Sequence, residues 1–223
     1  TTDGGMTISS SFSIVNEASA SSSVGTSDMD AGFTLAMPGG SKIDVLNAGN
    51  ASGSHAVSIP GSAGAEGVAT TSTNAAQTGL DFMTDSTVQG IEYHTASDFL
   101  ADGLKMSFSA STDSGAAAGA TYRVDSHVAI GATYVTDLGD TALTIGGGYS
   151  AADGSKTETA ATDSGGFHVG LSAVTGDLTV AVGFADGDKA GVNIASTDQI
   201  EGDVVKAGIK YVTGDLTFNV GLT

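Results

Sequence analysis

Two sets of charged residues in this sequence have the types and spacing to act on a passing solute. The first set lies in short segments of alternating polarity and comprises Lys42, Glu92, His94, Lys105 and Arg123. The second set lies in the irregular stretch 49–87 and comprises Glu66, Asp81 and Asp85. If that stretch folds against the alternating segments, opposite charges face each other across a narrow gap. Such a transverse field orients polar solutes and disfavours apolar ones.

Patterns for catalysis and for tight metal binding are weak. The four His residues lie far apart, without the spacing of a zinc-binding motif, and the chain contains no GxSxG sequence, no Cys nucleophile and no phosphate-binding loop. We therefore expect no enzymatic activity, no cofactor and no His-based metal site. Asp186 and Asp188 are weak candidates for a loop-bound Ca²⁺. Solvated loop acids are the alternative interpretation of that pair.

Composition excludes several classes of protein. The 223 residues include no Cys, and 25 acidic residues outweigh 7 basic ones, for a net charge of −18. A disulfide framework is thus excluded, and so acidic a chain should repel nucleic acid. Only 14% of residues are charged, which argues against acidic disorder. No segment approaches the ~18 consecutive apolar residues of a membrane-spanning helix.

The apolar residues alternate with polar ones on both sides of tight turns. In residues 204–223, Ile209 and Tyr211 precede the turn Gly214-Asp215, and Phe218 and Val220 follow it on the same face. Period-two alternation around a Gly-Asp turn predicts a β-hairpin with one apolar face. Similar hairpins are expected at 128–149 and 167–184, with a repeat of ~38 residues.

We expect eleven strands in one domain that spans residues 1–223. Their connections alternate in length, with tight turns near 38–40, 96–102, 136–141 and 175–177. Longer polar loops are expected near 16–27, 111–120, 152–164 and 185–203, and residues 49–87 form the longest. Loops beyond ~15 residues are uncommon in compact domains and are often functional.

Short turns at one end and long loops at the other are typical of outer-membrane barrels. Tyr93, Tyr134 and Tyr211 are expected on the apolar face near the short turns, where an interfacial aromatic girdle would lie. The fold class we predict is an all-β, antiparallel, up-and-down transmembrane barrel with short periplasmic turns and long outer loops. A soluble β-sandwich, with its apolar face in a core, would show the same alternation.

The chain resembles the general bacterial porins, trimeric sixteen-stranded barrels of the Gram-negative outer membrane. The resemblance rests on residues 42–47, on GIEYHTASDFLADGLKMSFSAS at 90–111 and on the later YVTGDL-type hairpins. In that family the long loop after the fifth strand folds into the barrel and narrows the pore. The next strand carries a Tyr followed by a basic pore-lining residue, a place that Tyr93 and His94 occupy here.

The resemblance implies a water-filled channel for passive diffusion of small hydrophilic solutes and ions, with outer-membrane lipid and lipopolysaccharide around it and a homotrimeric assembly. The acidic composition adds an expected preference for cations. Three features depart from the family: an odd number of strands, no terminal aromatic, and no match to the first two strands. We therefore expect this sequence to correspond to roughly strands three to thirteen. The alternative function is that of a secreted or cell-surface β-rich binding or structural protein of the adhesin type.

Overall fold

A computed structural model describes residues 2, 4–13, 30–45, 51–61, 73–74, 90–112, 123–156, 160–161, 164–189 and 200–222. Almost all of the described chain is β-strand, and the strands are antiparallel. This confirms the all-β, antiparallel part of the sequence-based prediction. None of the helical structure in the described residues is long and apolar enough to cross a membrane.

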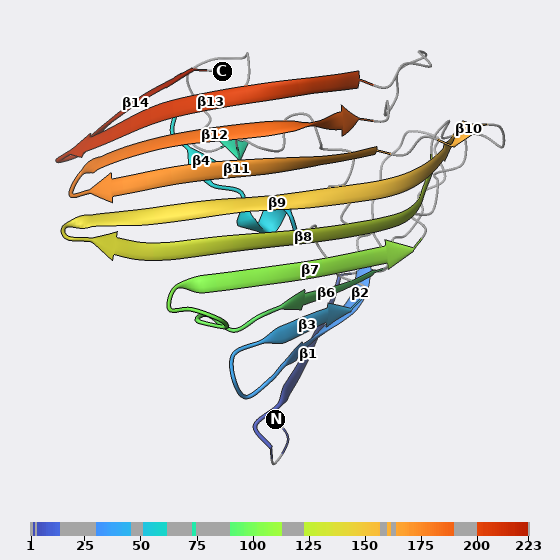
Figure 1. The fold of residues 1–223 in the computed structure, drawn as a ribbon. Coiled ribbons are helices and arrows are strands. Elements are labelled where there is room, and N and C mark those ends of the chain that lie inside the picture. Colours follow the sequence, from blue (N-terminus) through green and yellow to red (C-terminus); the bar gives the residue numbers. More distant parts are fainter. Residues whose placement is uncertain are drawn as a thin grey trace, which may run out of the picture.

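The strands pair mainly with their neighbours along the chain, in an up-and-down order (Figure 1). Eleven strands form one continuous path. They are β1 (Thr7–Ser13), β2 (Asp30–Ala36), β3 (Lys42–Val45), β6 (Gly90–His94), β7 (Leu104–Thr112), β8 (Arg123–Leu138), β9 (Thr141–Lys156), β11 (Ser164–Thr175), β12 (Leu178–Lys189), β13 (Ile200–Thr213) and β14 (Leu216–Leu222). Within the described residues β1 and β14 are the edges of this path, and the sheet is not closed.

The connections described within this sheet gather at one end, on the left of Figure 1; most are tight turns, and the longest, between β6 and β7, comprises residues 95–103. Gly139, Gly176 and Gly214 occupy three of them with positive φ angles of 65°, 55° and 56°, a conformation that glycine adopts without strain. An Asp follows each of these glycines, as expected for two-residue hairpin turns. At the opposite end, β9 continues to Lys156 and β12 to Lys189, so these strands run further than the sequence predicted.

The two faces of the sheet differ in polarity and in exposure. On one face large apolar side chains remain open to solvent; Ile130 is 38% exposed and Val220 is 67% exposed. On the other face small, polar and charged side chains are buried, including Ser107, Ser150 and Lys206. The alternation therefore places the apolar side chains away from the covered face. We call these the outer face and the inner face.

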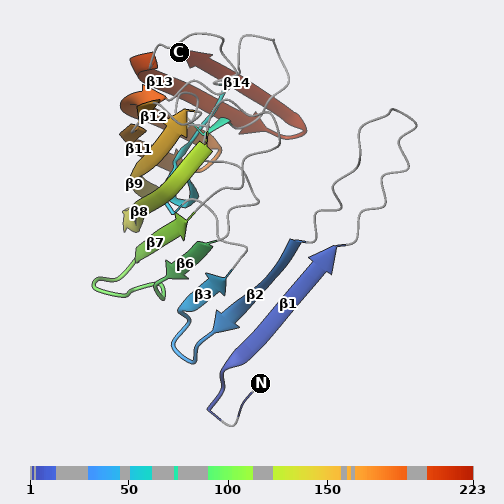
Figure 2. The ribbon, with the colours of Figure 1, turned by 90° about the vertical axis from the view of Figure 1, so that its right-hand side faces the viewer.

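Residues 51–61 cover part of the inner face. They contain the 3-10 helix η1 (Gly53–His55) and the two-residue strand β4 (Ser58–Ile59), which pairs with β5 (Thr73–Asn74). A further short strand, β10 (Ala160–Ala161), pairs with β9. Figure 2 shows η1 and β4 on the concave side of the bent sheet. Helix η1 contacts β8 and β9, and β4 contacts β11, β12 and β13. The described part of the predicted long loop at 49–87 thus contains two short regular elements, η1 and β4.

Candidate functional site

Hydrogen bonds fasten residues 51–61 to the inner face. The backbone N–H of Ala51 donates to Ser109 Oγ at 3.0 Å, and His168 Nε2 donates to the carbonyl oxygen of Ser52 at 2.9 Å. His55 is buried and makes two contacts, from Nδ1 to Thr133 Oγ1 at 2.7 Å and from Nε2 to Ser107 Oγ at 2.9 Å. The segment is therefore held to strands β7, β8 and β11 by side chains of the sheet.

Glycines in the sheet give the segment room to approach. A Cβ atom added at Gly131 would lie 2.5 Å from His55 Cδ2, and one at Gly148 would lie 2.5 Å from Ser52 Oγ. Added Cβ atoms would likewise overlap residues 51–61 at Gly146, Gly170 and Gly208. Real Cβ contacts are essentially never this close, so the five positions must stay without side chains for the segment to lie where it does. We call them the glycine cradle.

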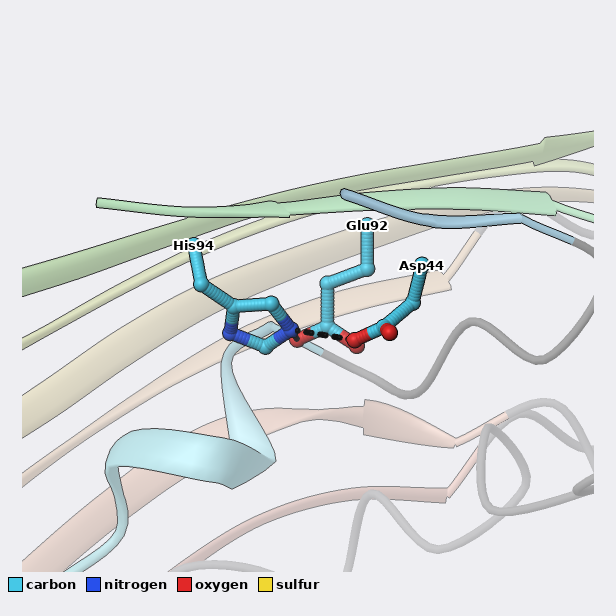
Figure 3. A group of neighbouring side chains, drawn as sticks. All are labelled: Asp44, Glu92 and His94. Atoms are coloured by element: carbon cyan, nitrogen blue, oxygen red, sulfur yellow. Dashed lines mark hydrogen bonds and ion pairs between the residues drawn. The ribbon is translucent and has the colours of Figure 1, made fainter. Parts of the chain in front are cut away.

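A charged cluster lies beside this segment on β3 and β6. Asp44 and Glu92 are a directly opposed pair in the strand register, and His94 follows two residues after Glu92 on the same face. His94 Nε2 lies 3.0 Å from Asp44 Oδ2 and 3.6 Å from Glu92 Oε1. Figure 3 shows the imidazole and the two carboxylates converging. Lys42 Nζ also donates to Asp44 Oδ2, at 2.9 Å.

A cavity of about 340 Å³ adjoins the cluster, between residues 51–61 and the sheet. Its lining is basic and rich in hydroxyl groups. The side chains that supply this character are Lys42, Ser54, His55, His94, Lys105 and Ser107. Such a wall can orient anionic or polar groups of a small solute.

The sequence singled out eight charged residues, five on the alternating segments and three on residues 49–87. The structure brings four of them together. Lys42, His94 and Lys105 line the cavity, and Glu92 lies beside His94. Arg123 begins β8, where its backbone pairs with Ser155, but its side chain lies outside the described part of the chain. The remaining three, Glu66, Asp81 and Asp85, lie outside the described residues, so their opposition to the basic wall stays a prediction.

The two weak calcium candidates lie in strand β12 and not in a loop. Asp186 is exposed and opposes Asp203 of β13, while the backbone of Asp188 opposes Glu201. The side chain of Asp188 is not among those that the structure describes. A Ca²⁺ at this pair stays a prediction.

Sequence reasoning missed the part that His55 plays. The residue lies in an irregular stretch without periodicity, so no pattern placed it on a face. The inner-face glycines are visible in the sequence as alternating positions, for example Gly146 and Gly148. A row of glycines on one face of consecutive strands is the signal that another segment approaches closely.

Comparison of the chain with protein-family models and with curated proteins finds no match. The function must therefore be argued from the sheet, the covering segment and the cavity themselves.

Acid should loosen the attachment of residues 51–61. Burial, together with the nearby charges of His94, His168 and Lys105, lowers the pKa of His55 from 6.5 to about 4. A His with a depressed pKa is bound in its neutral form, so attachment is complete above pH 6.5 and weakens as the pH falls from 6.5 toward 4. Over that window each pH unit should weaken attachment by up to ~10-fold. The measurement is the amide hydrogen-exchange protection factor of residues 51–61, that is, the exchange rate relative to the intrinsic rate at each pH.

The control is His55→Gln, which keeps a hydrogen-bonding side chain but does not titrate. Besides the three basic groups, Glu92 of β6 lies near His55 through its contact with Ser54 and belongs to the same environment. The protection factors of the variant should show little dependence on pH between 6.5 and 4. An unchanged pH dependence in His55→Gln would assign the effect to the neighbouring charges.

Proposed function

We propose that this sheet is the wall of an outer-membrane pore that conducts small hydrophilic solutes and ions by passive diffusion. The outer face meets lipid, and the inner face lines an aqueous passage that residues 51–61 narrow. The single observation that carries the proposal is the exposure of the apolar face. It remains uncovered on strand after strand, from Ile8 on β1 to Leu222 on β14.

A water-soluble protein would pay heavily for such a surface. Soluble monomers rarely expose contiguous apolar patches beyond a few hundred Å². In a soluble sandwich the apolar face would be the covered one, yet here the covered face holds Ser107, Glu92 and Lys206. This arrangement favours a lipid-facing sheet over the alternative of a secreted binding or structural protein.

The strand dimensions support the same proposal. Transmembrane strands need about 9–11 residues when tilted. Strands β11 and β12 have 12 residues each and β13 has 14. Along β12 no charge occurs between Asp177 and Asp186, and the eight intervening residues span roughly 26 Å at ~3.3 Å each. At a strand tilt of ~40° this length rises roughly 20 Å along the membrane normal, so the flanking residues of β12 would complete the ~25 Å apolar band of a barrel.

Aromatic side chains of the outer face lie near both ends of this band. Tyr134 and Tyr211 are exposed toward the short turns, and Tyr211 opposes Phe218. Toward the other end lie Tyr149 and Phe167, an opposed pair of β9 and β11. Aromatic rings concentrate at both membrane–water interfaces, so these positions fit two girdles.

In lipid the backbone groups at both edges of the sheet must be hydrogen-bonded. In the proposed pore the sheet therefore closes into a barrel, in which the free backbone groups of β1 and β14 are paired. The proposed setting is the outer membrane of a Gram-negative bacterium, with lipopolysaccharide as a neighbour and a homotrimer as the assembly.

The test is reconstitution of the purified chain in planar lipid bilayers. We expect stepwise increases in conductance and, in a KCl gradient, a reversal potential that favours cations because of the net charge of −18. The preference should weaken as salt rises, since the Debye length falls from ~30 Å at 0.01 M to ~3 Å at 1 M. Membrane insertion without conductance, or a chain that stays soluble without detergent, would contradict the proposal.

A further inference from the structure

Asp44 and Glu92 place two negative charges side by side. They oppose each other directly across β3 and β6, and both are buried. Like charges directly opposite each other on neighbouring strands are destabilising, and a lower dielectric strengthens the repulsion. The pair therefore favours a cation between its carboxylates.

The separations around His94 Nε2 suit a metal ion. The ligand atoms of Asp44, Glu92 and His94 all lie within 4.8 Å of one another. Nε2 is 3.0 Å from the Asp44 oxygen and 3.6 Å from the Glu92 oxygen. Zn²⁺ binds nitrogen and oxygen ligands at ~2.0–2.2 Å, so ligands of a tetrahedral ion lie roughly 3.3–3.6 Å apart. The two observed separations bracket that value.

A hydroxyl group from outside the cluster holds each of the three side chains. The hydroxyl of Thr34 donates to Asp44 Oδ1, and Ser54 Oγ donates to Glu92 Oε1 at 3.3 Å. Ser107 Oγ lies 2.9 Å from His94 Nδ1, which leaves Nε2 directed at the carboxylates (Figure 3). Partners of this kind orient the ligands of protein metal sites.

We propose that Asp44, Glu92 and His94 bind a divalent transition metal ion of the zinc type. One imidazole and two carboxylates suit Zn²⁺ better than Ca²⁺ or Mg²⁺, which take oxygen ligands almost exclusively. The adjoining cavity, which His94 lines, gives the ion access and supplies water as a fourth ligand. The proposal stands whether or not the protein conducts.

Lys42 competes with the ion. Its Nζ donates to Asp44 Oδ2, the same oxygen that faces His94 Nε2. Binding must therefore replace the Lys42 hydrogen bond together with the proton on Nε2. It follows that removing the Lys42 ammonium should strengthen binding, an effect that a damaged fold could not produce.

The experiment measures Zn²⁺ binding to the full chain in detergent by titration calorimetry, with the visible spectrum of bound Co²⁺ as a probe of tetrahedral geometry. Loss of a residue that only hydrogen-bonds to a metal ligand typically costs 10–100-fold in metal affinity. Loss of the ligand itself in His94→Ala should therefore weaken Zn²⁺ binding by more than ~10-fold. Lys42→Met should bind Zn²⁺ more tightly than the wild type. The control, His127→Ala, alters a buried inner-face His outside the cluster and should bind like the wild type.

Two results would overturn the proposal. The first is a wild type with no Zn²⁺ affinity beyond that of His94→Ala, which would leave His94 as a hydrogen-bonding partner of the two carboxylates. The second is weaker binding in Lys42→Met than in the wild type. Neither result bears on the bilayer conductance test, so the two proposals fail separately.

Discussion

Arginine in place of Val180 should prevent stable insertion of the protein into a membrane. Val180 lies within the uncharged part of β12, on the outer face, and is 44% exposed. At the midplane of a bilayer an arginine on the lipid face costs about 2–4 kcal/mol. The measurement is the free energy of unfolding of the chain refolded into lipid vesicles. The folded fraction is read from the electrophoretic mobility of unheated samples, in which a folded barrel migrates differently from the heat-denatured chain.

Thr179→Arg is the matched control, since Thr179 is the adjacent residue on β12 and belongs to the inner face. It opposes Lys210, so a like-charge pair adds a cost of roughly 0.2–1 kcal/mol. Thr179→Arg should therefore fold into vesicles nearly as well as the wild type. Equal losses in the two variants would contradict the assignment of the outer face to lipid.

Alanine at Gly208 should displace residues 51–61 and widen the passage. The added methyl would overlap the carbonyl of Pro60 and approach Ile59 Cγ2 at 3.0 Å. Overpacking of this kind costs about 1–3 kcal/mol, which the segment can avoid by lifting from the sheet. We expect a larger single-channel conductance and faster amide exchange in residues 51–61, while β13 itself keeps its pairing.

Gly39→Ala is the control for this variant. Gly39 lies in the turn before β3, and a Cβ built there meets nothing within 4 Å. Its effect on stability should stay within about 0.5 kcal/mol, and its conductance should equal that of the wild type. Unchanged exchange in Gly208→Ala would mean that the glycine cradle does not limit the position of the segment.

Most of the sheet could be predicted from the sequence because its information is local. Alternation fixes which residues share a face, and a two-residue turn such as Gly214-Asp215 fixes the register of its hairpin, here Thr213 with Leu216. The ends of β9 and β12 were misjudged because polar and small residues continue the strands there without an apolar pattern. Whether the sheet closes depends on pairing at β1 and β14, about which alternation carries no information.

The site was predictable only in part. Alternation places Lys42 with Asp44 on one face of β3 and Glu92 with His94 on one face of β6. That Asp44 opposes Glu92 could not be predicted, because it depends on the register between β3 and β6. A tight turn would fix that register, but the connection between these two strands is long. The position of His55 depends on contacts with Ser107 and Thr133, 52 and 78 residues away, so nothing near it in the sequence indicates them.

The glycine cradle also sets an order of events during folding. Residues 51–61 precede every strand that they touch, and the contact between Ser52 and His168 spans 116 residues. A contact of that range cannot form until the intervening strands have assembled, because the entropy of closing so long a chain segment must first be offset. The segment therefore settles last, onto a surface that β8 to β13 have already completed. A chain arrested before β13 pairs would lack the cradle position at Gly208, so its segment would be only partly seated.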